Sequence, residues 1–412
     1  MAGINNLSDF NRNYESFNFI ISNFISETHI LMSNTKHHRR TFIKTGILGT
    51  GGLLFCGNSL CRDTFRTLSK TYGTDLWKWS KEGYYYAQTA RGVRCLICPN
   101  ECDIKENETG DCRNRINYKG KLYSIAYGNP CAVNIDPVEK KPLYHFYPQS
   151  KAYSVATAGC NLACLNCQNW TISQVSPKET RNYDIMPAEL VKQAAAKKCK
   201  SIAYTYSEPI SFYEYTFDSS KLAREKGIKN ILVTAGYINE KPLRNLCKYI
   251  DAANVDLKSF SNDIYMKLNG GTLQPVLNTL KTVAEEGVWL EITNLIVPGW
   301  TDDMDMIKRM CDWLVKNNLA DYPLHFSRFH PQYKLTKLPP TPINTLKTAR
   351  ETALKAGIKY VYIGNAPGTG GENTKCPKCK KVLIERKGYA ILQNNIVQSK
   401  CKFCGTKIPG IW

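Results

Sequence analysis

Three closely spaced cysteines lie near the middle of the chain. Cys160, Cys164 and Cys167 form the pattern C-x3-C-x2-C, which is one thiolate short of the closed tetrahedral set that a structural metal site uses. Three thiolates can hold three irons of a [4Fe–4S] cluster and leave the fourth iron open to another ligand. The alternatives are a zinc site completed by a distant ligand and three cysteines packed in a core. The fold predicted for the following residues favours the cluster.

Two further groups of cysteines have complete ligand sets. The first, in the N-terminal part, is Cys95, Cys98, Cys102 and Cys112. Zinc is the simplest occupant of this set, and an auxiliary iron–sulfur cluster is the rival. The second, in the tail, is Cys376, Cys379, Cys401 and Cys404. Its two C-x2-C knuckles predict a zinc ribbon, and a mononuclear iron of the rubredoxin kind is the alternative.

Composition limits the class of protein. The chain has 412 residues, of which 43% are hydrophobic and 22% charged, as in an ordinary globular protein with one large core and small satellites. Eleven of its 17 cysteines lie in the three groups, which indicates metal sites rather than disulfides. The formal charge of +20 favours anionic partners such as nucleic acid, acidic lipid or an acidic protein face, although a solvated surface would also explain it.

The first ninety residues read as targeting and connecting segments. Arg39 and Arg40 precede a Phe-Ile pair and a weakly apolar, glycine-rich run, which is the layout of a twin-arginine export signal over 32–61. The run is too short for a transmembrane span, which needs about 20 apolar residues. We expect translation to start at Met32, so that 1–31 is a mis-annotated extension. Residues 62–90 are expected to be a linker.

Strand-like and helix-like segments alternate from residue 152 onward. The expected strands are Ala152–Thr157, Ser201–Tyr206, Asn230–Thr234, Ala253–Leu257, Val288–Leu295, Leu324–Phe329 and Tyr360–Gly364. The expected helices are Pro187–Lys198, Phe212–Lys226, Lys241–Tyr249, Gln274–Glu286, Asp302–Asn317 and Ile343–Ala356. Three of these helices end at a glycine that leads into a strand, namely Gly227, Gly287 and Gly357. The pattern predicts a parallel sheet closed, or nearly closed, into a (β/α) barrel.

Polar residues stand at the ends of successive expected strands. They are Cys160, Glu208, Thr234, Asp256, Asn294 and His330. Because ligands of such barrels bind at the carboxyl ends of the strands, these side chains are expected to share one site.

Several motifs carry a resemblance to a known family. They include Cys-Leu-Ile-Cys-Pro at 95–99, Glu-Lys-Lys-Pro-Leu-Tyr-His-Phe at 139–146, Cys-Gln-Asn-Trp at 167–170, Thr-Tyr-Ser-Glu-Pro at 205–209, Val-Asp-Leu-Lys at 255–258, Val-Pro-Gly-Trp at 297–300 and His-Phe-Ser-Arg-Phe-His-Pro at 325–331. From about residue 90 to 412 the chain resembles radical S-adenosylmethionine (SAM) enzymes of the pyruvate formate-lyase activating branch. More narrowly, it resembles the radical SAM member of the AmmeMemoRadiSam system.

The resemblance implies a role for each site residue. The three central cysteines would hold a [4Fe–4S] cluster, and Glu208 would receive the ammonium group of SAM. The remaining contacts would come from Thr234 and Asp256 (a monovalent cation), Lys258 (SAM), and Asn294 and His330 (the SAM ribose and carboxylate). One residue departs from the family pattern, since Asn166 stands where an aromatic residue usually packs near the adenine.

The resemblance also implies the reaction. A reduced cluster would cleave SAM to methionine and a 5′-deoxyadenosyl radical, which would abstract hydrogen from an unknown protein or small-molecule substrate. A low-potential donor of the flavodoxin or ferredoxin type would supply the electron. The alternatives are a radical SAM enzyme that modifies RNA held by the basic ribbon, and a cluster-bearing electron carrier. The export signal favours the periplasm or a membrane surface, whereas the supply of SAM and electrons favours the cytoplasm.

The expected organisation is an α/β fold with three parts beyond the linker. A Cys-rich metal-binding region spans 91–150, the partial or near-complete radical SAM barrel spans 151–366, and a zinc-ribbon-like domain spans 372–412.

Overall fold

The computed structural model describes residues 77–412. The expected segments 1–31 and 32–61, with the twin-arginine motif, and the first part of 62–90 lie outside the described residues.

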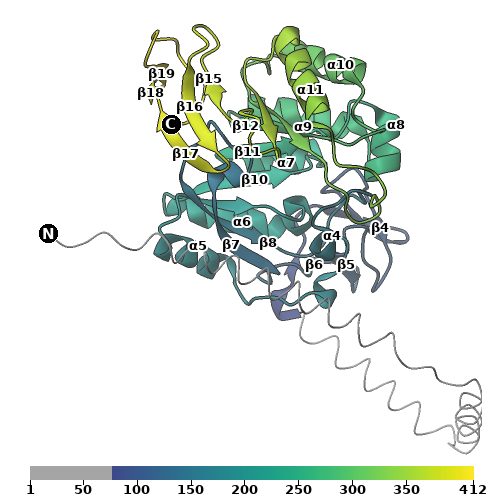
Figure 1. The fold of residues 1–412 in the computed structure, drawn as a ribbon. Coiled ribbons are helices and arrows are strands. Elements are labelled where there is room, and N and C mark those ends of the chain that lie inside the picture. The colour runs from purple at the N-terminus through teal and green to yellow at the C-terminus, as the bar shows by residue number, and fades with distance from the viewer. Residues whose placement is uncertain (1–76) are drawn as a thin grey trace, which may run out of the picture. The chain divides into compact units, whose positions relative to one another are not determined.

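One eight-stranded sheet forms the centre of the described chain, with its strands in the order β14-β13-β12-β11-β10-β9-β8-β7 (Figure 1). The strands are β7 (Ala132–Pro137), β8 (Lys151–Ala156), β9 (Ser201–Tyr204), β10 (Lys229–Thr234), β11 (Ala252–Asp256), β12 (Trp289–Ile296), β13 (Leu324–Arg328) and β14 (Val361–Gly364). Strands β8 to β14 run parallel, and β7 pairs antiparallel with β8. Because β7 and β14 end the order without pairing to each other, the sheet is a partial barrel. This confirms the predicted fold class.

Helices connect the parallel strands. The longer ones are α5 (Pro187–Ala196), α6 (Tyr213–Glu225), α7 (Glu240–Cys247), α9 (Leu273–Glu285), α10 (Met304–Lys316) and α11 (Ile343–Ala356). The shorter ones include α4 (Trp170–Ser173), α8 (Asn262–Ile264) and the π-helix η5 (Tyr265–Asn269). Gly227, Gly287 and Gly357 all have positive φ at the predicted helix ends, where glycine avoids the steric cost of a side chain. None of the described helices is long and apolar enough to cross a bilayer.

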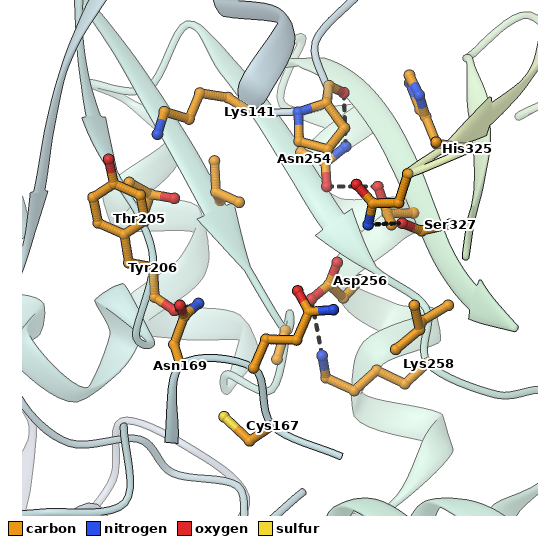
Figure 2. Close-up of a pocket in the computed structure, with 18 of the residues that line it drawn as sticks. Lys141, Cys167, Asn169, Thr205, Tyr206, Asn254, Asp256, Lys258, His325 and Ser327 are labelled. Atoms are coloured by element: carbon orange, nitrogen blue, oxygen red, sulfur yellow. Dashed lines mark hydrogen bonds and ion pairs between the residues drawn. The ribbon is translucent and has the colours of Figure 1, made fainter. Parts of the chain in front are cut away.

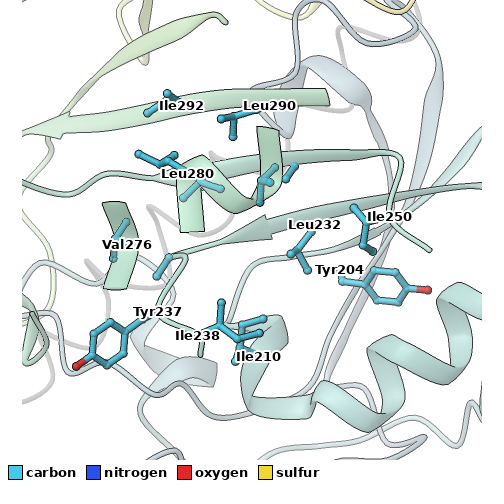
Figure 3. Packing of buried hydrophobic residues seen from close by; sticks show 14 of the residues in the cluster. Tyr204, Ile210, Leu232, Tyr237, Ile238, Ile250, Val276, Leu280, Leu290 and Ile292 are labelled. Atoms are coloured by element: carbon cyan, nitrogen blue, oxygen red, sulfur yellow. The ribbon is translucent and has the colours of Figure 1, made fainter. Parts of the chain in front are cut away.

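The two faces of the sheet are packed differently. Residues of one alternating set, such as Leu232, Leu290 and Ile292, pack with the helices in the main hydrophobic core (Figure 3). The opposite set is small at the base of the concave face, where alanines from β8, β9 and β11 pack with Phe146. Because side chains alternate between the two faces along each strand, only every second strand residue can reach the site.

The N-terminal Cys-rich region consists of two small sheets. One sheet has the order β1-β6-β5 and the other β2-β3-β4. Their strands are β1 (Lys81–Glu82), β2 (Tyr86–Thr89), β3 (Gly92–Cys95), β4 (Asp103–Ile104), β5 (Arg115–Tyr118) and β6 (Lys121–Ser124). Residues 77–90, expected to belong to a linker, therefore belong to this region, because β1 and β2 pair with β6 and β3. Residues Ala132–Pro137, assigned to the same region, instead form β7 of the central sheet.

The C-terminal ribbon packs against the barrel. It contains β15 (Thr374–Lys375), β16 (Val382–Lys387), β17 (Ala390–Asn394), β18 (Ile396–Val397) and β19 (Lys400–Cys401). The buried guanidinium of Arg386 on β16 donates to the backbone oxygen of Tyr144 at 2.8 Å and stands over the Tyr144 ring. Tyr360 and Tyr362 share a small core with the ribbon residues Leu383 and Ile384. The ribbon is thus fixed to the segment that precedes the barrel and to β14.

Candidate active site

A cavity of about 740 Å³ lies at the carboxyl ends of the parallel strands. Its wall includes all three cysteines of the C-x3-C-x2-C loop and residues that end β9, β10, β11, β12, β13 and β14. In Figure 2, Cys167 lies in the lower part of the view, Lys141 and Tyr206 lie left of centre, and Asp256 and Lys258 lie right of centre. Of the predicted strand-end residues, Cys160, Glu208, Thr234 and Asp256 line this cavity.

The cysteine loop follows β8 and is fixed by backbone hydrogen bonds to η5. Ala163 N donates to Asn269 O, and Leu165 N donates to Leu268 O, both at 2.8 Å. Gly159, just before the loop, has φ +95°, and a Cβ there would lie 2.4 Å from the backbone oxygen of Cys112. Glycine is needed at this position because the loop passes against the N-terminal Cys-rich region.

Few hydrogen-bond donors contact the sulfur atoms of the three loop cysteines. Leu162 N donates to Cys160 Sγ at 3.4 Å, and Asn269 Nδ2 donates to Cys164 Sγ at 3.3 Å. Burial raises the pKa of Cys160 well above its usual value, and Glu208 raises it further. A bound cation would therefore be needed to keep this sulfur as a thiolate at neutral pH. Among the described residues of the cavity wall there is no fourth cysteine, so the donor set fits a [4Fe–4S] cluster with one open iron.

Glu208 is a buried carboxylate in the cavity wall, between β9 and α6. Its oxygens accept from Thr234 Oγ1 at 2.6 Å, Ala235 N at 2.8 Å and Ile210 N at 3.1 Å. Burial raises its pKa, and these donors oppose the rise. The hydrogen bonds fix the carboxylate at the end of β10, and one lone-pair position is left for a ligand donor. Thr234 thus lines the cavity and also orients Glu208.

Asp256 and Lys258 form an ion pair at the end of β11. Lys258 Nζ lies 2.8 Å from Asp256 Oδ2, and the Lys258 amide donates to the Tyr265 hydroxyl at 3.0 Å. Burial works against the charge of Lys258, but the adjacent Asp256 outweighs it, so the pKa of Lys258 lies well above its usual value. Both side chains line the cavity, as the sequence predicts.

Two residues of the predicted site do not line the cavity. Asn294 is buried, but its Nδ2 donates to Leu257 O at 2.7 Å, and the wall at β12 is formed by Thr293 and Leu295 instead. His330 is exposed two residues beyond β13, whereas His325 and Ser327 of that strand line the cavity. The alternation of side chains along β12 explains the first difference, because residues 293 and 295 point to the face opposite that of 294.

His325 is a wall residue that sequence reasoning did not assign to the site. Its Nε2 lies 2.7 Å from Glu291 Oε2 on β12, and its ring stacks on Tyr362. Glu291 also accepts from the backbone amides of Tyr144 and His145 at 2.9 and 2.7 Å. The sequence places Glu291 and His325 34 residues apart, so only the pairing of β12 with β13 brings them together.

A second unassigned group lies on the other side of the cavity. Lys141, buried, donates to Asp136 Oδ2 at 2.6 Å, and the Tyr206 hydroxyl donates to the same oxygen. Lys141 Nζ also stands 4.3 Å from the centre of the Tyr206 ring. Burial lowers the pKa of Lys141 to about 8, although Asp136 opposes this effect. Lys141 belongs to the Glu-Lys-Lys-Pro motif, but the motif alone does not predict that Lys141 lines the cavity.

The four tail cysteines meet at one point. Their sulfur atoms all lie within 4.8 Å of one another, and the pairs Cys376–Cys404 and Cys379–Cys401 are each 3.7 Å apart. A tetrahedron with Zn–S bonds of about 2.3 Å has edges of about 3.8 Å. The arrangement is consistent with the predicted zinc ribbon.

The N-terminal cysteines lie around a second, much smaller cavity. It is lined by Cys95, Cys98, Cys102 and Cys112 together with residues that include Ile97, Ile104, Arg115, Asn161 and Ile210. The predicted grouping of these four cysteines is therefore present in the fold.

Comparison with known proteins identifies the class. Residues 154–314 match the radical SAM superfamily. The chain is 29% identical to the pyruvate formate-lyase 1-activating enzyme of Escherichia coli K12 over 157 residues, which are 37% of this chain and 63% of that protein. It is also 29% identical to the pyruvate formate-lyase-activating enzyme of Staphylococcus aureus over 236 residues, 52% of this chain and 90% of that protein. Residues 154–314 thus form a domain of the radical SAM superfamily, and the chain is similar to these activating enzymes.

A longer match gives the narrower family. An uncharacterized protein of Methanocaldococcus jannaschii is 49% identical over 318 residues, which are 77% of this chain and 95% of that protein. The chain belongs to the family of this archaeal protein. Among solved structures, a radical SAM methyltransferase from Sphaerobacter thermophilus aligns with a TM-score of 0.42 and 14% identity, over 53% of this chain and 67% of that chain.

Proposed function

We propose that this chain reductively cleaves SAM at a [4Fe–4S] cluster held by Cys160, Cys164 and Cys167, and that it abstracts hydrogen from a protein substrate. The observation that supports this most directly is that three cysteines and a buried, oriented carboxylate share one cavity. When bound and reduced, the cluster supplies the electron that cleaves the sulfonium and yields a 5′-deoxyadenosyl radical.

The residues of the cavity have separate tasks in this proposal. Glu208 receives the ammonium group of SAM, because its remaining acceptor position faces a cavity in which a cation would otherwise be poorly solvated. Thr234 and Ala235 hold Glu208 in place. Asp256 and Lys258 supply one charge of each sign at the next strand end, so they can bind a monovalent cation and a carboxylate or ribose oxygen of SAM.

Asn166 replaces the usual aromatic residue of the loop with a polar contact. It is buried in the cavity wall, and its Oδ1 has no hydrogen-bond partner among the described residues. An unpaired buried carbonyl costs about 1–3 kcal/mol. An amine donor such as that of adenine would remove this cost, so we assign Asn166 to the adenine side of the site.

A protein substrate is supported by the relatives and by the form of the cavity. The related enzymes are, by name, activators of pyruvate formate-lyase, and within this branch we assign the chain to the radical SAM member of the AmmeMemoRadiSam system. The turn between β16 and β17 contributes Gly388 and the exposed Tyr389 to the cavity wall. A peptide entering beside this turn would exclude water from the radical, and an electron donor of the flavodoxin or ferredoxin type would serve as reductant.

Isotope transfer tests both parts of the proposal. Anaerobically reconstituted protein is incubated with SAM, dithionite and a desalted protein fraction from cells grown in deuterated medium. We expect 5′-deoxyadenosine that carries deuterium, and none without reductant. No 5′-deoxyadenosine from protein with a full cluster would refute SAM cleavage. Deuterium transferred only from the small-molecule fraction would refute a protein substrate.

RNA modification is a second candidate that one observation favours. The ribbon has eight exposed basic residues, namely Lys375, Lys378, Lys380, Lys381, Lys387, Lys400, Lys402 and Lys407. Such a surface can neutralise phosphates, and binding to RNA would then weaken steeply with salt. In the same assay, deuterium transferred from an RNA fraction would favour this candidate over a protein substrate.

A further inference from the structure

We propose that the N-terminal cysteines Cys95, Cys98, Cys102 and Cys112 hold an iron–sulfur cluster rather than zinc, and that this cluster exchanges electrons with the cluster of the C-x3-C-x2-C loop. The inference goes beyond SAM cleavage. The assignment of the N-terminal cluster is independent of the proposed function, whereas the electron exchange rests on the loop cluster proposed above. Sequence spacing alone leaves zinc and iron–sulfur open at these cysteines, and the geometry of the fold separates them.

The two four-cysteine sets differ in how closely their sulfur atoms approach. The tail set converges within 4.8 Å, with edges of 3.7 Å that match a single tetrahedral ion. Among the residues that the structure describes, the N-terminal set does not form such a group. A cluster spreads its thiolates over several irons, so it needs a wider set than a single ion does.

The wider set surrounds a cavity with an apolar wall. The four cysteines line it together with Ile97, Ile104 and Ile210, and three of the cysteines are themselves buried. A lone zinc ion would draw four thiolates together and leave no such space. A multi-iron group with bridging sulfides fills a space of this kind, and an apolar wall protects it from water.

One buried donor faces the same cavity without a partner. Arg115 is one of the residues that line it, and its guanidinium pairs with Glu214 through two hydrogen bonds of 2.7 and 2.8 Å. Its Nε, on a side chain only 2% exposed, has no hydrogen-bond partner among the described residues. An N–H group in this position is suited to a cluster sulfur, and such hydrogen bonds adjust the reduction potential of a cluster.

The cavity lies directly against the loop that carries Cys160. A Cβ on Gly159 would lie 2.4 Å from the backbone oxygen of Cys112. Asn161, next to Cys160, lines the N-terminal cavity, and its backbone oxygen accepts from Asn100 Nδ2 at 3.0 Å. The segments that carry the ligands of the two sites are therefore in direct contact. An electron from a low-potential flavin or iron–sulfur carrier would reduce the N-terminal cluster and pass to the other cluster, with no bond made or broken at the N-terminal site.

Metal analysis of two proteins tests the assignment. In the variant with Cys160→Ala, Cys164→Ala and Cys167→Ala, prepared without oxygen, we expect iron and sulfide to remain in at least two copies per chain. Zinc should stay near one per chain, in the tail. Zinc near two per chain with no iron would overturn the proposal.

Wild-type protein provides the measurement that does not depend on the folding of the variant. We expect more than four irons per chain, because one [4Fe–4S] cluster accounts for four. After full reduction, the electron paramagnetic resonance spectrum should show two neighbouring spins that broaden each other. Four irons, two zincs and one isolated spin would contradict the proposal. If the irons are present but no SAM is cleaved, this inference stands and the proposed function fails.

Discussion

The cysteine loop of 160–167 and the ribbon of 376–404 both bind metal in this account, but they differ in what the fold leaves free. In the ribbon, four sulfurs converge on one point and no ligand position remains. In the loop, three sulfurs line a large cavity that also contains Glu208, Asp256 and Lys258. In the proposed function, reactivity depends on the missing fourth thiolate and on the charged residues around it.

The largest effect is expected from the loop. Cys164→Ser should reduce SAM cleavage to background, because a cluster with only two protein thiolates is not held. The product 5′-deoxyadenosine measures this by chromatography. Cys131→Ser is the matched control, because Cys131 lies outside the three cysteine groups, and it should keep wild-type activity. Retained activity in Cys164→Ser would refute the cluster assignment.

A smaller effect is expected from the carboxylate beside the loop. Glu208→Gln keeps an acceptor for Thr234 but removes the charge that meets the SAM ammonium. Losing a charged hydrogen bond of about 1.5–3 kcal/mol should raise the Kd of SAM about ten- to a hundredfold. Isothermal titration without oxygen measures it. Glu189→Gln, at a half-buried position of α5 outside the cavity wall, is the control, and equal affinity in both variants would contradict the assigned role.

Breaking the ribbon should affect catalysis less than breaking the loop. The double variant Cys379→Ser and Cys401→Ser should lose one zinc per chain and part of the thermal stability. SAM cleavage should stay within about tenfold of wild type, a change of about 1.4 kcal/mol. Metal analysis and the 5′-deoxyadenosine assay measure both. Complete loss of SAM cleavage with the cluster still present would show that the ribbon is part of the chemistry.

The last prediction concerns stability and not catalysis, in the segment that joins the two regions. Lys141 faces the cavity, and Tyr144 of the same segment binds Arg386 of the ribbon. Because burial lowers the pKa of Lys141 to about 8 from a usual 10.5, the unfolded chain binds more protons between these pH values. The free energy of unfolding should therefore rise with pH in this window, by at most about 3 kcal/mol from this group.

The variant Lys141→Met isolates this contribution. The free energies of unfolding of both proteins are measured with urea at pH 7.5 and 9.5. Relative to the variant, wild type should be more stable at pH 9.5 than at pH 7.5. Asp136, whose pKa is lowered, and Tyr206, whose pKa is raised, keep their charge states across the window. A pH-independent difference would contradict the buried cation.

Much of this architecture could be predicted from the sequence, because local signals encode it. Buried strands separated by helices that end at Gly227, Gly287 and Gly357 define the sheet order without knowledge of long-range contacts. The cysteine groups are visible from spacing alone. For the same reason the strand-end residues Glu208, Thr234 and Asp256 are predicted to share a site, and all three line the cavity. Lys258, which the family resemblance predicts, lines it too.

The parts of the site and fold that the sequence does not predict depend on strand register and on pairing between strands that are distant in the sequence. Asn294 was chosen because it ends a strand, but the alternation along β12 directs Thr293 and Leu295 into the cavity. His325 acquires its position only through Glu291 on the neighbouring strand. The sequence predicts a linker over 77–90 because the strands there are short and find their partners, β3 and β6, elsewhere in the chain.

The open iron of the C-x3-C-x2-C loop is the central claim, and Mössbauer spectroscopy of protein enriched in ⁵⁷Fe tests it most directly. With SAM added without oxygen, the account predicts that one iron of the loop cluster changes its isomer shift while the other three do not. Spectra that are identical with and without SAM, or zinc in place of iron at this loop, would contradict it.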